Sequence, residues 1–140
     1  MRIVAGSAKG RVLAAPKSDD VIRPTADRVR ETIFNVLGQR CDGLTVLDLF
    51  AGTGALGLEA VSRGAIKAVL IDRDKEALAL CRLNTDTLKF TDRVEIIPAT
   101  AIAGIAALGK KGRVFELVFS DPPYALTAGV PVLEALADAK

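Results

Sequence analysis

From residue 44 to the end of the chain, short apolar runs alternate with longer amphipathic stretches. The apolar runs are nearly continuous, which is typical of strands that are buried on both faces. The amphipathic stretches repeat apolar residues at helical spacing, and two of them end at Gly64 and Gly109. This alternation predicts an α/β, Rossmann-like fold, in which helices cover both faces of a parallel sheet. We expect strands at 45–50, 68–72, 93–97 and 115–120, and helices at 55–62, 75–88, 102–108 and 130–139.

The first 40 residues follow a different pattern. Two apolar runs, 2–5 and 11–14, are joined by residues 6–10, a loop that has glycine at both ends. Short apolar runs on either side of such a loop predict a β-hairpin. A polar connector over residues 16–23 follows the hairpin.

A helix is expected after Pro24, because proline is favoured at helix starts. Thr25 or Asp27 stands near its N-cap, where such side chains accept backbone hydrogen bonds. Arg28 and Arg30 fall outside the apolar stripe that we expect to face the core. The residues of that stripe are Val29, Ile33, Phe34, Val36 and Leu37.

The chain has 140 residues, a length that predicts one domain over 1–140. It has no histidine, which excludes His-based triads, His-ligated zinc and an imidazole base. Cys41 and Cys81 lie in different expected elements without a metal-binding spacing, so we expect reduced thiols, no metal and a cytoplasmic protein. No apolar run approaches the roughly 18 residues of a membrane span, so no membrane partner is expected.

Charge is uneven along the chain, although its formal net value is only +2. Residues 1–40 hold eight Lys and Arg against four Asp and Glu, a net +4, and residues 41–140 hold eleven against thirteen, a net −2. We therefore divide the domain into a basic N-terminal part, 1–40, and a core, 41–140. A basic segment on a near-neutral domain suggests a polyanionic partner. On charge alone, a solvated basic arm that binds no partner is an equally good interpretation.

A glycine-rich loop joins the first expected strand to its helix, where residues 48–57 read Asp-Leu-Phe-Ala-Gly-Thr-Gly-Ala-Leu-Gly. Glycines there let the backbone turn tightly and approach a ligand, and the helix that follows presents unpaired N–H groups. Asp72 ends the next strand, where a carboxylate accepts hydrogen bonds from ribose hydroxyls. These features predict a site for a nucleoside-containing cofactor. The simpler alternative is a tight strand–helix turn that binds no ligand.

The spacing Gly52-x-Gly54-x-x-Gly57 also fits the dinucleotide fingerprint, so NAD is an alternative cofactor. Asp48 argues against NAD, because a carboxylate just before the loop would repel a diphosphate. The same carboxylate suits S-adenosylmethionine, which carries a sulfonium and an ammonium group and no phosphate. The cofactor-binding residues predicted around this loop are Asp48, Phe50, Ala51, Gly52, Thr53, Gly54, Asp72 and Arg73.

The tetrapeptide Asp121-Pro122-Pro123-Tyr124 directly follows the fourth expected strand. In an open parallel sheet that point is the carboxyl edge, beside the first strand and its loop. Because the prolines hold the backbone rigid, the Asp121 carboxylate and the Pro122 carbonyl offer two fixed acceptors for the hydrogens of an exocyclic amine. Tyr124 offers an aromatic face on which a flipped base stacks. All four residues are predicted to be catalytic in methyl transfer to a nucleic-acid base, and Asp121 also to contact the cofactor.

Beyond these motifs, the sequence resembles the RsmD-type enzymes, a family of class I S-adenosylmethionine-dependent methyltransferases. The resemblance covers essentially the whole chain and is carried by residues 1–6, 9–11, 23–35, 47–60 and 62–65. It implies methylation of the N2 amine of a guanine in 16S ribosomal RNA, within a 30S particle or an assembly intermediate. The tetrapeptide alone is equally compatible with methylation of adenine N6 in DNA or RNA. The choice of guanine therefore rests on the resemblance.

The resemblance also implies roles for residues outside the two motifs. It implies that the basic N-terminal part contacts the RNA. Arg23 and Arg28 are expected to contact the substrate or to order a loop, with a surface salt bridge on the helix as the alternative role. The predicted RNA contacts are Arg2, Arg11, Arg23 and Arg28. After the third strand, where the family often has Asp or Asn against the adenine of the cofactor, this chain has Thr100 and Ala101. The resemblance implies that these two residues bind the cofactor there, through the Thr100 side chain or through backbone groups.

The family's sheet has seven strands, and its members continue through three more strands after the helix expected at 130–139. The sequence stops at Lys140, so the last strands of that sheet are expected to be missing. A parallel sheet of four strands leaves an apolar edge strand uncovered. The alternative function is therefore that of a truncated protein that binds the cofactor and RNA but has no catalytic activity.

Overall fold

The computed structural model describes residues 1–16 and 27–120. The strands and helices expected after residue 44 are present within this part, and their ends differ from the expected ones by two residues at most. The helix expected at 130–139 lies outside the described residues. The elements are α1 (Asp27–Val36), β1 (Thr45–Leu49), α2 (Ala55–Ser62), β2 (Lys67–Asp72), α3 (Lys75–Leu88), β3 (Val94–Pro98), α4 (Ala101–Lys110) and β4 (Leu117–Ser120).

The four described strands form one parallel sheet in the order β3-β2-β1-β4. The chain moves outward from β1 to β2 and β3 and then returns to the other side of β1 with β4. The order therefore reverses at β1, and in open α/β sheets ligands bind beside such a point, at the carboxyl ends of the strands. The register pairs Leu49, the last residue of β1, with Ile71 and with Ser120.

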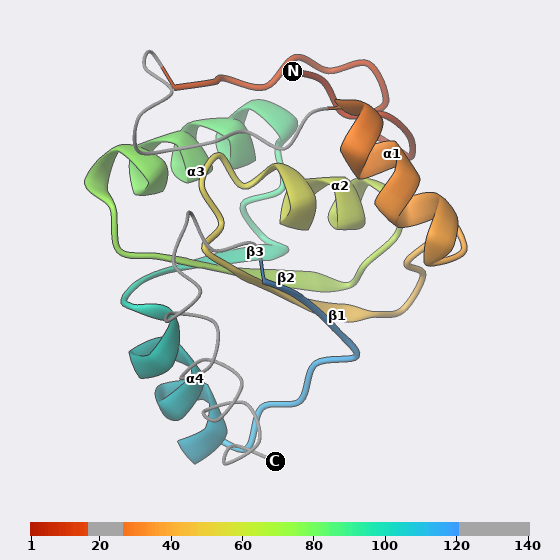
Figure 1. Ribbon diagram of the computed structural model, residues 1–140. Coiled ribbons are helices and arrows are strands. Elements are labelled where there is room, and N and C mark those ends of the chain that lie inside the picture. Colours follow the sequence, from red (N-terminus) through yellow and green to blue (C-terminus); the bar gives the residue numbers. More distant parts are fainter. Residues whose placement is uncertain (17–26, 121–140) are drawn as a thin grey trace.

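Helices cover both faces of the sheet, as expected. In Figure 1, α1, α2 and α3 lie on one face and α4 lies on the other. Side chains alternate between the two faces along the central strands: Val46 and Leu70 join the core under α1, α2 and α3, while Leu47 and Val69 join the core against α4. The fold is therefore the α/β arrangement that the apolar pattern predicts.

The prediction of which α1 residues face the core is wrong in part. Phe34 is buried as expected, and its ring packs edge to face on Phe119 of β4, with centroids 5.6 Å apart. Arg30, expected outside, is fully buried, because its guanidinium meets the carboxylates of Asp27 at 2.6 Å and Glu59 at 3.5 Å. Three expected core residues are exposed instead, namely Val29, Val36 and Leu37.

Candidate functional site

The glycine loop, residues 50–54, lies at the carboxyl edge of the sheet between β1 and α2. Three of its residues have a left-handed backbone: φ is 56° at Phe50, 60° at Gly52 and 82° at Gly54. Glycine adopts this conformation freely, but in a phenylalanine it is uncommon and marks a turn that the surroundings enforce. The sharp turn predicted from the glycines is confirmed, and the left-handed Phe50 adds a feature that the sequence did not indicate.

Gly57 and Asp48 bring the start of α2 close to the sheet. A Cβ at Gly57 would lie only 2.3 Å from Cδ2 of Leu70, so a side chain there would push α2 away from β2. Asp48 is buried, and its Oδ2 accepts a 3.0 Å hydrogen bond from the Gly57 backbone N–H. The carboxylate of Asp48 therefore lies at the N-terminal end of α2, where the helix dipole favours negative charge.

Asp72 closes the other side of the loop. Its Oδ2 accepts the Gly52 N–H at 2.9 Å, and its Oδ1 accepts the Asp74 N–H at 2.9 Å. Asp74 in turn caps α3 by accepting the Ala77 N–H at 2.9 Å. The half-buried carboxylate of Asp72 is thus held beside the glycine loop by two backbone groups, and each of its oxygens keeps capacity for a further hydrogen bond.

The back of the glycine loop rests on α3, a support that the sequence reasoning missed. The Cys81 thiol donates to the Gly52 carbonyl at 3.2 Å, and the Asn84 amide donates to the Thr53 carbonyl at 2.9 Å. The Thr53 hydroxyl contacts Sδ of Met1 at 3.7 Å. A polar Asn84 on the apolar inner face of α3 is the sequence signal that could have revealed this support, since buried amides need partners.

We expect Cys81 to resist alkylation by iodoacetamide in the native protein at neutral pH. Burial raises the pKa of its thiol far above the usual range, and the carboxylates of Asp48 and Asp72 raise that pKa further. The thiolate is the reactive form, so its population at pH 7 is negligible. Mass spectrometry after a timed reaction measures this, with the urea-unfolded chain as the control that reacts. Rapid modification of Cys81 in the folded protein would contradict the expectation.

The N-terminal arm, residues 1–16, forms the expected antiparallel pairing. Arg2 and Val12 make an isolated bridge, and backbone bonds run from the Ile3 N–H to the Arg11 carbonyl at 3.0 Å and from the Leu13 N–H to the Met1 carbonyl at 2.8 Å. The arm crosses the outer side of the helical layer that contains α1, α2 and α3 (Figure 1). It therefore lies over helices that support the glycine loop.

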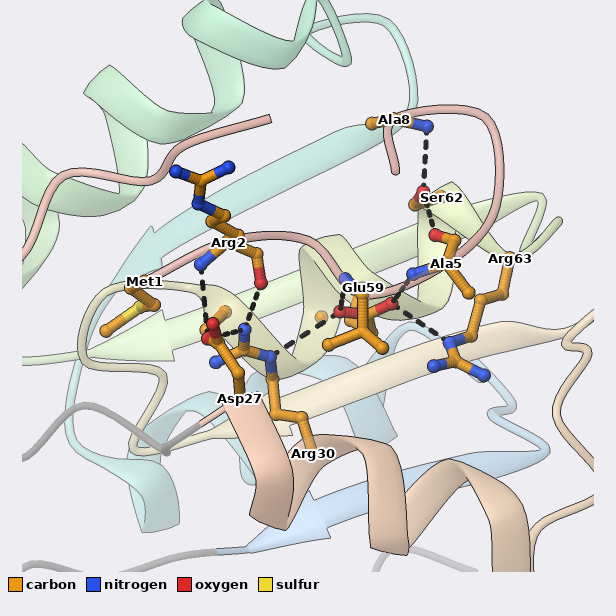
Figure 2. A network of polar contacts seen from close by, with 12 residues as sticks. Met1, Arg2, Ala5, Ala8, Asp27, Arg30, Glu59, Ser62 and Arg63 are labelled. Atoms are coloured by element: carbon orange, nitrogen blue, oxygen red, sulfur yellow. Dashed lines mark hydrogen bonds and ion pairs between the residues drawn. The ribbon is translucent and has the colours of Figure 1, made fainter. Parts of the chain in front are cut away.

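A buried polar network fixes this arm to α1 and α2 (Figure 2). The carboxylate of Glu59, fully buried in α2, accepts the Val4 N–H at 2.9 Å and the Ala5 N–H at 3.1 Å. It also pairs with Nε of Arg63 at 3.0 Å and with Arg30. The arm is therefore held by a carboxylate whose charge is matched by two arginines.

Asp27 and Ser62 extend the network at its two ends. The Asp27 carboxylate accepts the Arg2 backbone N–H at 3.1 Å and the Arg30 guanidinium at 2.6 Å, and Arg30 also donates to the Arg2 carbonyl. Burial alone would raise the pKa of Asp27, but these hydrogen bonds hold it below its usual value. The Ser62 hydroxyl accepts the Ala8 N–H at 2.9 Å and donates to the Ala5 carbonyl at 2.6 Å.

The predicted RNA contacts in the described residues are exposed. The Arg2 side chain points away from the polar network, to which this residue contributes backbone groups (Figure 2). Arg28 is exposed on α1, and Arg11 donates to the Thr87 carbonyl at 2.8 Å near the C-terminal end of α3. Arg23 lies outside the described residues.

The remaining predicted site residues are divided between the described chain and the segment beyond it. Thr100 caps α4, since its hydroxyl accepts the Ala103 N–H at 3.1 Å, and Ala101 is buried behind it. Arg73 is exposed after β2. Asp121, Pro122, Pro123 and Tyr124 lie outside the described residues. Ser120, which precedes them in the sequence, is in register with Leu49 at the start of the glycine loop.

The described residues hold neither a metal cluster nor a membrane-spanning helix. Within residues 1–16 and 27–120, there is no group of three or more His, Cys, Asp and Glu that could hold a metal ion. In the same part of the chain, no helix combines the length and the apolar character needed to cross a membrane.

Comparisons with solved structures establish the class of fold. The protein yhhF of Escherichia coli superposes with a TM-score of 0.84 over 99% of this chain and 73% of its own length, at 35% identity. A hypothetical protein of Thermus thermophilus gives a TM-score of 0.82 over 96% of this chain and 78% of its own, at 31% identity. Together with the parallel sheet and its glycine loop, they define the class I methyltransferase fold.

The chain also matches a family model described as conserved hypothetical protein 95 over residues 1–140, and it belongs to that family. It is 42% identical over 124 residues to "Ribosomal RNA small subunit methyltransferase D" of Escherichia coli K12, which covers 89% of this chain and 60% of the relative. The resemblance inferred from the sequence motifs is confirmed. The chain spans about 60 to 67% of the length of the curated relatives with 42% identity.

Proposed function

We propose that this chain uses S-adenosylmethionine to methylate the N2 amine of a guanine in 16S ribosomal RNA. The observation that carries the proposal is the junction at the carboxyl edge, where the glycine loop, the Asp72 carboxylate and the end of β4 at Ser120 come together. Family membership and the ribosomal RNA methyltransferase named among the relatives support it. We further propose a cytoplasmic protein that acts on a 30S particle or an assembly intermediate.

The residues of the loop fit S-adenosylmethionine better than NAD. Asp72 offers carboxylate oxygens beside a left-handed glycine backbone, a combination that suits ribose hydroxyls. At the N-terminus of α2, the Gly57 N–H is already bonded to Asp48, and that carboxylate would repel a diphosphate. A sulfonium and an ammonium group are favoured by the same negative charge.

The tetrapeptide at 121–124 supplies the proposed chemistry. S-adenosylmethionine provides an electrophilic methyl group, so the protein needs to orient the amine rather than to supply a strong base. Asp121 and the Pro122 carbonyl would accept the two amine hydrogens, which directs the nitrogen lone pair toward the methyl group, with Pro123 stiffening the backbone. The N–CH3 bond would form as the S–CH3 bond breaks, which leaves S-adenosylhomocysteine, and the methylated nitrogen would then release one proton to water. Tyr124 would stack on the base.

The exposed arginines of the arm and of α1 are the proposed RNA contacts. Arg2, Arg11 and Arg28 present positive charge on the surface of the described chain, and Arg23 lies between the arm and α1 in the sequence. Such contacts to phosphates make binding depend steeply on salt concentration. The Arg11 contact to the end of α3 would set the position of one of these charges.

The decisive experiment measures transfer of a tritiated methyl group from the cofactor. Protein-free 16S RNA, 30S particles and DNA are the three substrates, and digestion to nucleosides identifies the methylated base. Labelled N2-methylguanine from 16S RNA or 30S particles is the expected product. Labelled N6-methyladenine would overturn the guanine assignment, and cofactor binding without transfer to any substrate would favour a non-catalytic binding protein.

Replacing Asp72 with alanine is expected to weaken S-adenosylmethionine binding by about tenfold or more, since hydrogen bonds to a charged group contribute about 1.5–3 kcal/mol. Isothermal titration calorimetry measures the dissociation constant. Asp92→Ala, which removes an exposed carboxylate before β3, is the matched control and should bind like the unaltered chain. Equal affinities for the two variants would remove Asp72 from the site, and binding of NADH without S-adenosylmethionine binding would overturn the proposed cofactor.

A further inference from the structure

We infer that Asn84 is a positioning residue that couples RNA binding at the N-terminal arm to cofactor binding at the glycine loop. The inference rests on the proposed function for its two ligands. Asn84 lies on α3 with only 1% of its surface exposed. Its side chain is closed off from solvent, so it acts on the two proposed ligand sites through the backbone of the arm and of the glycine loop, which it contacts on either side.

The oxygen and the nitrogen of the Asn84 amide are both hydrogen-bonded to the N-terminal arm, and the nitrogen is also bonded to the glycine loop. Its Oδ1 accepts the Ala14 N–H at 2.6 Å, and its Nδ2 donates to the Ala14 carbonyl at 3.1 Å. The side chain thus pairs with Ala14 as a neighbouring strand would. The same Nδ2 donates to the Thr53 carbonyl at 2.9 Å, so one amide group bridges the end of the arm and the glycine loop.

A second contact joins the same two segments independently. The start of the arm reaches the loop through Sδ of Met1, 3.7 Å from the Thr53 hydroxyl. Met1 and Leu13 are themselves paired, since the Leu13 N–H donates to the Met1 carbonyl at 2.8 Å. Met1 therefore contacts Thr53 directly, and Ala14, toward the other end of the arm, is linked to Thr53 through Asn84.

This arrangement makes the positions of arm and loop interdependent. If either segment moved alone, the partly buried backbone groups of Ala14 or the buried Thr53 carbonyl would lose their partner. Losing the partner of a fully buried group costs about 1–3 kcal/mol. A ligand that orders the loop therefore also orders the arm, and the second ligand then binds with a smaller loss of conformational entropy. Coupling of this kind is reciprocal: RNA tightens cofactor binding by the factor by which the cofactor tightens RNA binding.

A purely structural role for Asn84 would have a different signature. Loss of general stability lowers the affinities for both ligands but leaves the ratio between cofactor affinities with and without RNA unchanged. A positioning role changes that ratio. Asn84→Ala removes all three hydrogen bonds, whereas Asn84→Asp keeps the shape and removes both donors. Thr85→Val is the matched control, because the Thr85 hydroxyl is buried one residue away and bonds within α3 to the Cys81 carbonyl at 2.6 Å.

Two measurements test the inference with S-adenosylhomocysteine, which prevents turnover, and protein-free 16S RNA. Hydrogen exchange in residues 1–16 should slow when the unaltered chain and Thr85→Val bind the cofactor product, and should change little in the Asn84 variants. Calorimetry measures the affinity for S-adenosylhomocysteine with and without RNA. RNA should raise this affinity by about fivefold or more in the unaltered chain and in Thr85→Val, and should leave it nearly unchanged in the Asn84 variants.

The outcomes separate this inference from the proposed function. Binding of S-adenosylhomocysteine to the unaltered chain without slower exchange in the arm would overturn the coupling and leave the cofactor site in place. Equal protection and equal ratios in Asn84→Asp and the unaltered chain would assign Asn84 a structural role only. Absence of any binding to the unaltered chain would overturn the proposed function together with the coupling.

Discussion

Replacing Glu59 with alanine is expected to lower the free energy of unfolding by about 3–5 kcal/mol, the range for removing one partner of a buried charge pair. The Glu59 carboxylate is fully buried and balances Arg30 and Arg63, which are 0% and 4% exposed. Without it, Arg30 and Arg63 lose the carboxylate that they share, and the N–H groups of Val4 and Ala5 lose their acceptor. The arm and the face of α1 that packs on α2 should loosen together.

Urea unfolding followed by circular dichroism measures this change. Glu31→Ala is the control, because it removes an exposed glutamate from α1 and should alter stability by less than about 0.5 kcal/mol. Glu59→Gln adds a second test, since its amide group places donors against the donors that the carboxylate accepted. A loss below about 1 kcal/mol in Glu59→Ala would mean that the network contributes little to folding.

The central sheet and its loop were predictable because their signals are local. Apolar runs mark the strands, and glycines at 52, 54 and 57 mark the turn, since positive φ at the first two positions and close packing against Leu70 at the third leave little choice of residue. The position of Asp72 beside the loop follows from its place at the end of β2. Parallel topology then brings these ends to one edge without knowledge of side-chain contacts.

The inner face of α1 was predicted wrongly because its signal is not local. Apolar spacing favours Val29 and Val36 as core residues, yet Arg30 lies inside because Glu59, 29 positions further along the chain, offers a buried carboxylate. Hydrophobic periodicity has no means of recognising a buried charge whose partner is on another helix.

The support of the loop by α3 was missed for a related reason. Cys81 lies on the buried face of α3, but its hydrogen bond to the Gly52 carbonyl depends on how α3 packs against the loop. Asn84 was not singled out, because a single amide on a helix has many local uses. Its contacts with Thr53 and Ala14, 31 and 70 positions away, exist only in the folded chain.

Replacing Asp121 with alanine is expected to reduce the rate of methyl transfer by about 100-fold to 1000-fold, the usual effect of removing one preorganised polar group from a reacting centre. Cofactor affinity should change by no more than about twofold, because the loop and Asp72 supply the main proposed contacts. Single-turnover transfer from tritiated S-adenosylmethionine measures the rate, and calorimetry measures the affinity.

Two further variants decide between a catalytic and a structural role for Asp121. Asp121→Asn keeps one carbonyl acceptor but turns an N–H donor toward the amine. Its rate of methyl transfer should therefore lie between the rates of the unaltered chain and of Asp121→Ala. Asp92→Ala serves again as the exposed carboxylate control. Equal losses of rate and of cofactor affinity in Asp121→Ala would mean that the aspartate shapes the site rather than orients the amine. A selective loss of rate would assign the reaction to the tetrapeptide beside Ser120, at the edge where β4 meets the glycine loop.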